Sequence, residues 1–134
     1  MTAPCAGIIV FDNDKTILVS TQNGNFSFPK GKRNKGETSI DTAWREFNEE
    51  TGMNGENIKL IDDIPIDENS DKGNLNIRYY VGHLVKHSTL KCDPEELDSV
   101  AWYSIADALK FDKFKKTRKD ILMKAYEKYK NYLN

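Results

Sequence analysis

The stretch GKRNKGETSIDTAWREFNEETGM, residues Gly31–Met53, decides the fold of this chain. It begins with a basic loop and ends with three glutamates within five residues, Glu46, Glu49 and Glu50. Between these two parts, apolar side chains recur at intervals of three and four, at Ile40, Ala43, Trp44, Phe47 and Thr51. This spacing predicts an amphipathic helix, and it places the glutamates on a different side from the apolar face.

The limits of this helix can be read from its flanking residues. Thr38 or Ser39 can cap its start, because a hydroxyl oxygen accepts a hydrogen bond from the first free backbone N–H groups. Gly52 suits the left-handed conformation that follows a helix end. The predicted helix therefore runs from about residue 39 to residue 51.

The three glutamates repel one another at this spacing, and the helix dipole also disfavours anions near a helix C-terminus. Each such contact costs tenths of a kcal/mol to about 1 kcal/mol. A divalent cation would reverse the effect, since Mg²⁺ prefers oxygen ligands and retains substrate phosphates and water in its coordination shell. Taken alone, the triplet would instead be an ordinary solvent-exposed face in which Arg45 pairs with Glu49.

The loop before the helix carries the opposite charge. Its basic residues are Lys30, Lys32, Arg33 and Lys35. Their side chains can donate hydrogen bonds to phosphate oxygens, and Gly31 and Gly36 permit tight turns. Taken alone, the loop could equally be an exposed basic turn. Beside the acidic helix, it indicates a site for a polyphosphate–metal complex that is held from both sides.

Outside this stretch, short apolar runs predict strands at residues 7–11, 16–20, 25–28, 57–66, 75–85 and 99–105. Pro29 and Gly31 are expected to end the third strand, and residues 67–74 form a polar loop. A short helix is predicted at residues 104–111. A longer helix follows Phe114, with an apolar stripe interpreted as core packing. This order predicts a single α/β domain over residues 1–134, with a mixed sheet and helices packed against it.

The central stretch resembles the Nudix box, G-x₅-E-x₇-R-E-U-x-E-E-x-G-U, where U is a bulky apolar residue. The matching positions are Gly31, Glu37, Arg45, Glu46, Phe47, Glu49, Glu50, Gly52 and Met53. Only Phe47 departs slightly, being aromatic where an aliphatic residue is usual. The resemblance implies the family's α/β/α sandwich. It also implies hydrolysis of a diphosphate linkage with Mg²⁺ or Mn²⁺.

The resemblance further implies roles for particular residues. The Gly31 carbonyl and the three glutamates of the triplet would bind the metal, with Glu49 and Glu50 also catalytic. Arg45 would orient a catalytic glutamate through a salt bridge, and Glu37 would hold the loop onto the helix. Glu96 is expected as a further base or metal ligand, because many members place an acidic residue in a loop outside the box; a slip of one residue would select Glu95.

The substrate is less sharply defined than the reaction. The segment FSFPKGKRNKGE resembles members that hydrolyse dinucleoside polyphosphates or remove mRNA caps. Residues 104–122, SIADALKFDKFKKTRKDIL, look more like the dinucleoside polyphosphate members, in which a similar A-L-x-x-x-x-F-x-x-x-R run follows the final strand. Diphosphoinositol polyphosphates and nucleoside triphosphates are the alternatives. Lys30, Lys32 and Arg33 are expected to bind substrate phosphates. Phe28 and Tyr80 are expected to contact the substrate base, although each could instead be a core residue.

The distribution of charge allows a nucleic-acid substrate. Nine Lys/Arg stand against three Asp/Glu in residues 110–134, although the whole chain has a formal charge of −1. This basic segment would suit the binding of an RNA 5′ end. Alternatively, its lysines only cover the solvent-exposed face of a helix. Two further hypotheses are a catalytically silent Nudix module, which would normally lack glutamates of the box, and an RNA-binding protein.

The remaining features concern the protein's surroundings. Two cysteines without metal-type spacing favour a reducing, cytoplasmic location. The start of the chain lacks the pattern of a signal peptide, and no apolar run reaches the ~20 residues of a membrane span. We therefore expect no membrane partner. The sequence is compatible with a monomer or a homodimer.

Overall fold

Helix α1, Ser39–Thr51, forms where the apolar spacing predicts it. Thr38 is the N-cap, and it forms a reciprocal pair with Asp41: the Asp41 N–H donates to Thr38 Oγ1 at 3.1 Å, and the Thr38 N–H donates to Asp41 Oδ2 at 3.2 Å. Gly52 follows the helix with φ 79°. Its N–H donates to the Asn48 carbonyl at 2.9 Å. These caps fix both ends of the helix that carries the glutamates.

A computed structural model describes residues 2–134. Its strands are β1 (Cys5–Asp12), β2 (Lys15–Ser20), β3 (Phe26–Ser27), β4 (Lys30–Lys32), β5 (Ile58–Leu60), β6 (Ile66–Asn69), β7 (Leu75–Leu84) and β8 (Ser99–Ser104). The helices besides α1 are α2 (Ile105–Ala108) and α3 (Lys116–Leu133).

The strands form one mixed sheet around β1. This strand pairs in parallel with β7, from Cys5 opposite Ile77 to Phe11 opposite His83. It also pairs in antiparallel fashion with β2 and β4. The sheet extends through β3 and β8 beside β2 and through β5 and β6 beside β7. The predicted α/β class and mixed sheet are therefore confirmed.

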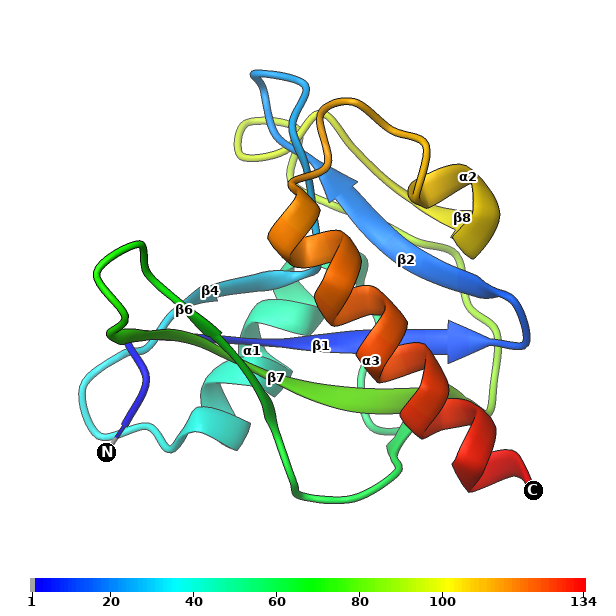
Figure 1. The fold of residues 1–134 in the computed structure, drawn as a ribbon, viewed down its shortest axis with the longest axis horizontal. Coiled ribbons are helices and arrows are strands. Elements are labelled where there is room, and N and C mark those ends of the chain that lie inside the picture. The colour runs from blue at the N-terminus through cyan, green and yellow to red at the C-terminus, as the bar shows by residue number, and fades with distance from the viewer. Residues whose placement is uncertain (1) are drawn as a thin grey trace.

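Helices cover both faces of this sheet, so the architecture is the expected α/β/α sandwich (Figure 1). Alternate residues of β1 point in opposite directions. Ile9 and Phe11 pack in the cluster that includes α3, whereas Ile8 and Val10 pack in the cluster that includes α1. All four side chains are fully buried. Burying each of these side chains contributes on the order of 1.5–3 kcal/mol.

Two strand predictions were wrong in their limits. The chain does not end its pairing at Pro29 and Gly31, because residues 30–32 form β4 against the start of β1. The predicted strand at 57–66 is two short strands, β5 and β6. Between them the Ile64 N–H donates to Asp62 Oδ1 at 2.9 Å, which forms a turn, and Pro65 has no N–H to donate. Strand β6 then continues into the segment predicted as a loop.

Within residues 2–134, no helix combines the length and the apolar character that crossing a membrane requires.

Candidate active site

Arg45 lies at the centre of the acidic side of α1. Its Nε donates to Glu37 Oε2 at 2.8 Å, and its Nη2 donates to Glu37 Oε1 at 3.0 Å. Nη1 donates to Glu46 Oε1 at 2.9 Å and to Glu49 Oε1 at 3.3 Å. Nη2 also donates to the Lys32 carbonyl at 2.7 Å. One guanidinium therefore joins the basic loop to the helix and orients two glutamates of the triplet.

Glu37 completes this connection from the loop side. Its Oε1 accepts from the Asn34 N–H at 2.8 Å and from Thr42 Oγ1 at 3.0 Å. The hydrogen bonds from Arg45, followed by the one from the Asn34 backbone, lower the pKa of Glu37 to about 2. The same contacts raise the pKa of Arg45. Glu37 thus remains ionised at neutral pH and occupies the structural position expected from the sequence.

Gly31 allows the carboxylate of Glu46 to approach the backbone of β4. A Cβ atom built on Gly31 would overlap the carboxyl carbon and both oxygens of Glu46. Any side chain at position 31 would therefore displace this carboxylate. The glycine at the start of the box is explained by this close approach of backbone and carboxylate.

Glu50 lies in a more desolvated environment than the other glutamates of the triplet. Its Oε1 accepts from the Lys30 N–H at 3.0 Å. Burial, with smaller contributions from the charges of Glu46 and Glu96, raises its pKa to about 7 despite that hydrogen bond and the Lys30 charge. Burial and the charges of Glu49 and Glu96 also raise the pKa of Glu46. The ionised forms of Glu46 and Glu50 are therefore disfavoured, and a positive charge beside them would stabilise these forms.

These donors fit a hard divalent cation. Carboxylate oxygens and a backbone carbonyl are the ligands that Mg²⁺ and Mn²⁺ prefer. Across residues 2–134, however, no three His, Cys, Asp or Glu side chains already converge as a metal-binding group. The Glu49 carboxylate is 50% exposed and hydrogen bonded to Arg45. A shared ion would therefore require Glu49 to rotate away from Arg45, and its exposure leaves room for this rotation.

The loop after residue 92 brings Glu96 near the triplet. Gln22 Nε2 donates to the Glu95 carbonyl at 2.7 Å, which holds the loop against the turn after β2. Leu97 is buried and lines the pocket that contains Glu50. The charge of Glu96 contributes to the raised pKa values of Glu46 and Glu50. A role for Glu96 as the further base or metal ligand stays a prediction.

A pocket of about 100 Å³ adjoins Glu50. Lys30 and Arg118 line it together with Phe26 and Leu97. Burial, followed by the positive charge of Arg118, lowers the pKa of Lys30. Sequence reasoning identified Lys30 but missed Arg118, which reaches this pocket from the first turns of α3. The sequence signal for Arg118 was its place as the arginine of the run A-L-x-x-x-x-F-x-x-x-R at residues 108–118.

The other predicted substrate residues are placed differently. Lys32 and Arg33 are exposed on the basic loop, and Arg33 Nη1 donates to the Glu37 carbonyl at 3.3 Å. Phe28 is fully buried between Tyr79 and Phe114, with edge-to-face ring contacts. Phe28 also lines the pocket that contains Glu50, so its contact with a substrate base stays a prediction.

Tyr80 is also a core residue. It is 5% exposed and packs in the cluster beneath α1, with Ala43 and Phe47. The burial of Tyr80 favours the core position that the sequence left open. Phe26 is partly buried and lines the pocket. Its ring meets Tyr103 edge to face and stacks on Phe111, with the centroids of Phe26 and Phe111 4.4 Å apart.

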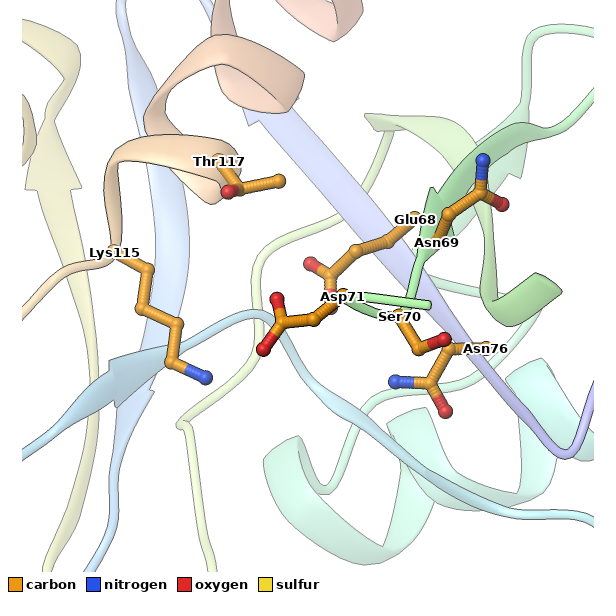
Figure 2. Close-up of a pocket in the computed structure, with 7 residues that line it drawn as sticks. All are labelled: Glu68, Asn69, Ser70, Asp71, Asn76, Lys115 and Thr117. Carbon is orange, nitrogen blue, oxygen red and sulfur yellow. The ribbon is translucent and has the colours of Figure 1, made fainter. Parts of the chain in front are cut away.

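A second pocket of about 240 Å³ lies between the turn joining β6 to β7 and the start of α3. Figure 2 shows Lys115 and Thr117 on the α3 side and Glu68, Asp71 and Asn76 on the other. None of the residues predicted from the box lines this pocket. It is separate from the acidic triplet.

The raised pKa of Glu50 predicts how stability changes with pH. Because the folded-state value is about 7 and the ordinary value is 4.5, the folded protein retains a proton that the unfolded chain loses between these values. The contribution of Glu50 to stability is therefore complete below pH 4.5 and decreases as the pH rises through 7. In EDTA, urea unfolding from pH 5 to 8 should show the wild type losing at most about 3 kcal/mol relative to Glu50→Gln. Parallel profiles for the two proteins would contradict this assignment.

Comparison with known proteins identifies the family. A family model described as the NUDIX domain matches residues 1–125. An RNA pyrophosphohydrolase of Psychromonas ingrahamii is 37% identical over 60 residues, which cover 43% of this chain and 33% of that protein. The match with this relative thus spans about one third of the relative's length.

Solved structures show the same fold. An Ap4A hydrolase of C. elegans, in a binary complex, superposes with a TM-score of 0.82 at 18% identity, covering 95% of this chain and 98% of that one. A NUDIX-family hydrolase of Clostridium perfringens has a TM-score of 0.76 at 15% identity, covering 95% and 97%. Because the family model extends from the first strand into α3, the chain belongs to the Nudix family, whose pyrophosphohydrolases act on phosphoanhydride bonds and generally use a divalent metal ion.

Proposed function

We propose that this chain is a divalent-metal-dependent hydrolase that cleaves a phosphoanhydride bond in a nucleotide-capped polyphosphate. One observation carries the proposal: the desolvated carboxylates of Glu46 and Glu50 lie beside a pocket lined by the cations of Lys30 and Arg118. Carboxylates suit a metal ion, and the two cations suit the phosphates that accompany it.

The chemistry follows from the properties of these residues. When bound, Mg²⁺ or Mn²⁺ neutralises phosphate charge and acidifies water. Glu50, which lines the pocket, is the candidate to accept a proton from the attacking water. Arg45 keeps Glu46 oriented through its guanidinium, which Glu37 holds in place. Lys30 offsets negative charge that develops on the leaving phosphate, and Glu96 is the candidate for a further ligand or base.

A dinucleoside polyphosphate, such as diadenosine tetraphosphate, is the leading substrate class. Support comes from the box-entry segment FSFPKGKRNKGE and from the superposition with the C. elegans Ap4A hydrolase along nearly the whole length of both chains. Phe26, which lines the pocket and stacks on Phe111, offers apolar surface for a base.

An RNA 5′ end is the second candidate. The P. ingrahamii relative is an RNA pyrophosphohydrolase, and α3 presents exposed basic side chains such as Lys124 and Lys130. Such a substrate would bind with strong salt dependence, because each phosphate contact releases counterions.

The proposal is tested by a panel of substrates with products identified by mass. The panel contains diadenosine tetraphosphate, 5′-triphosphorylated RNA, capped RNA, a nucleoside triphosphate and a diphosphoinositol polyphosphate, each with Mg²⁺ or EDTA. We expect Mg²⁺-dependent cleavage, fastest for diadenosine tetraphosphate, with nucleotide products. Binding without cleavage of any member would instead indicate a catalytically silent module, and faster cleavage of RNA would select the second candidate.

A further inference from the structure

Arg118 and Glu68 form an ion pair inside the protein, 50 residues apart in the sequence. Arg118 Nε donates to Glu68 Oε1 at 3.0 Å, and Nη2 donates to Oε2 at 3.4 Å. Only 13% of the Arg118 side chain and 9% of the Glu68 side chain are exposed. The pair connects α3 to β6. It places a rigid, oriented guanidinium next to the interior of the proposed active site.

Stability alone does not explain a charged pair at this position. Removing two charges from water costs several kcal/mol per ion, and apolar side chains of similar volume often serve as well. Arg118 and Lys30 also lie on the same pocket, beside Glu50. Two cations that line the same pocket are unfavourable until an anion lies between them.

The geometry leaves Arg118 able to bind such an anion. The hydrogen bonds to Glu68 use Nε and Nη2, and the Tyr79 hydroxyl interacts with the same guanidinium. Arg118 lines the pocket of about 100 Å³ together with Lys30 and Glu50. A guanidinium held on one side by a carboxylate can still present its remaining N–H groups to a phosphate.

We propose that Arg118 and Lys30 form a phosphate subsite on the α3 side of Glu50, with Glu68 as the residue that positions Arg118. The inference rests on the proposed function, because the phosphate would belong to the polyphosphate chain of the substrate. The chain would then extend from the acidic triplet across Lys30 toward α3. The subsite accordingly favours long polyphosphate chains over a simple diphosphate.

The test separates binding from folding by removing both members of the ion pair. Arg118→Met alone would leave the Glu68 carboxylate buried without its partner and destabilise the protein. The double variant Arg118→Met/Glu68→Met should therefore retain its thermal midpoint. We expect its KM for the long-chain substrate to rise about 10-fold to 100-fold, as for the loss of a charge-assisted hydrogen bond, with kcat near the wild-type value. Lys116→Met, an exposed change of charge in the same turn of α3, should leave KM unchanged.

A second measurement does not depend on turnover. Inorganic tripolyphosphate, titrated calorimetrically into each protein in EDTA, should bind the wild type and Lys116→Met alike, and the double variant at least about 10-fold more weakly. Arg118→Lys retains the positive charge but lacks the planar guanidinium with its several N–H donors. It should therefore bind tripolyphosphate with intermediate affinity. This variant provides the test if the double variant does not fold.

The outcomes distinguish this inference from the proposed function. Unchanged tripolyphosphate affinity in a folded double variant, or in Arg118→Lys, would overturn the subsite even if the wild type hydrolyses its substrate. Conversely, if the wild type cleaves no member of the substrate panel, the hydrolase proposal fails, while weaker tripolyphosphate binding by the variants would still support the subsite.

Discussion

Glu50→Gln is expected to lower kcat by about 10²-fold to 10⁴-fold without unfolding the protein. An amide oxygen can still accept the hydrogen bond that the Lys30 N–H donates at 3.0 Å. An amide cannot, however, accept a proton from water or provide the negative charge that attracts a cation. Because burial disfavours the ionised carboxylate, the variant should be at least as stable as the wild type near neutral pH.

The measurement compares kcat with the thermal midpoint for the same preparations. Glu56→Gln, an exposed glutamate in the turn after α1, provides the matched control and should retain wild-type activity. A Glu50→Gln protein with wild-type turnover would remove Glu50 from the proposed mechanism. A large decrease in the thermal midpoint of Glu50→Gln would show that the activity is lost because the protein unfolds.

Gly31→Ala should be the second most damaging substitution. The added Cβ would overlap the Glu46 carboxylate, so either this side chain or the β4 backbone must move. Displacing one oxygen ligand and its neighbour Arg45 should weaken activity by about 10-fold to 100-fold, as observed when the supporting contacts of metal ligands are changed. Raising the Mg²⁺ concentration should restore part of the rate.

A matched glycine is available as the control. A Cβ on Gly55 meets no atom within 4 Å, and its backbone lies outside the left-handed region. Gly55→Ala should therefore leave both activity and stability unchanged. Equal activities for Gly31→Ala and Gly55→Ala would show that the close approach of Gly31 to Glu46 has no functional importance.

The helix and its site were predictable because their signals are local. Cap residues, apolar spacing and the acidic triplet all lie within one stretch of sequence, and α1 forms with Thr38 and Gly52 at its ends. Arg45 and Glu37 are eight residues apart, so a helix and the loop before it suffice to bring them together.

The features that were missed depend on contacts between distant segments. Strand β4 exists because Lys32 lies opposite Cys5, a pairing that no local pattern reveals. The exposed or buried state of Phe28 depends on Tyr79 and Phe114, which come from β7 and from the segment before α3. An aromatic residue near a motif is therefore an ambiguous signal until these partners are known.

The pair of Arg118 with Glu68 shows the same limit for charged residues. In the sequence, Arg118 is one of several basic residues in the last 25, and Glu68 lies in a segment predicted to be a polar loop. Only the packing of α3 against β6 distinguishes Arg118 from the exposed lysines around it. The basic composition of the segment indicates an anionic partner. Which basic residue contacts that partner depends on burial, which the sequence does not show.

The central claim is that the acidic triplet holds the metal ion on which hydrolysis depends. The most direct test measures the initial rate for the best substrate of the panel while Mg²⁺ is titrated into EDTA-treated wild type and Glu49→Gln. We predict a background rate in EDTA, a saturable rise for the wild type, and half-maximal activation at about 10-fold to 100-fold higher Mg²⁺ for the variant. Full activity in EDTA, or identical Mg²⁺ dependence of the two proteins, would contradict the claim.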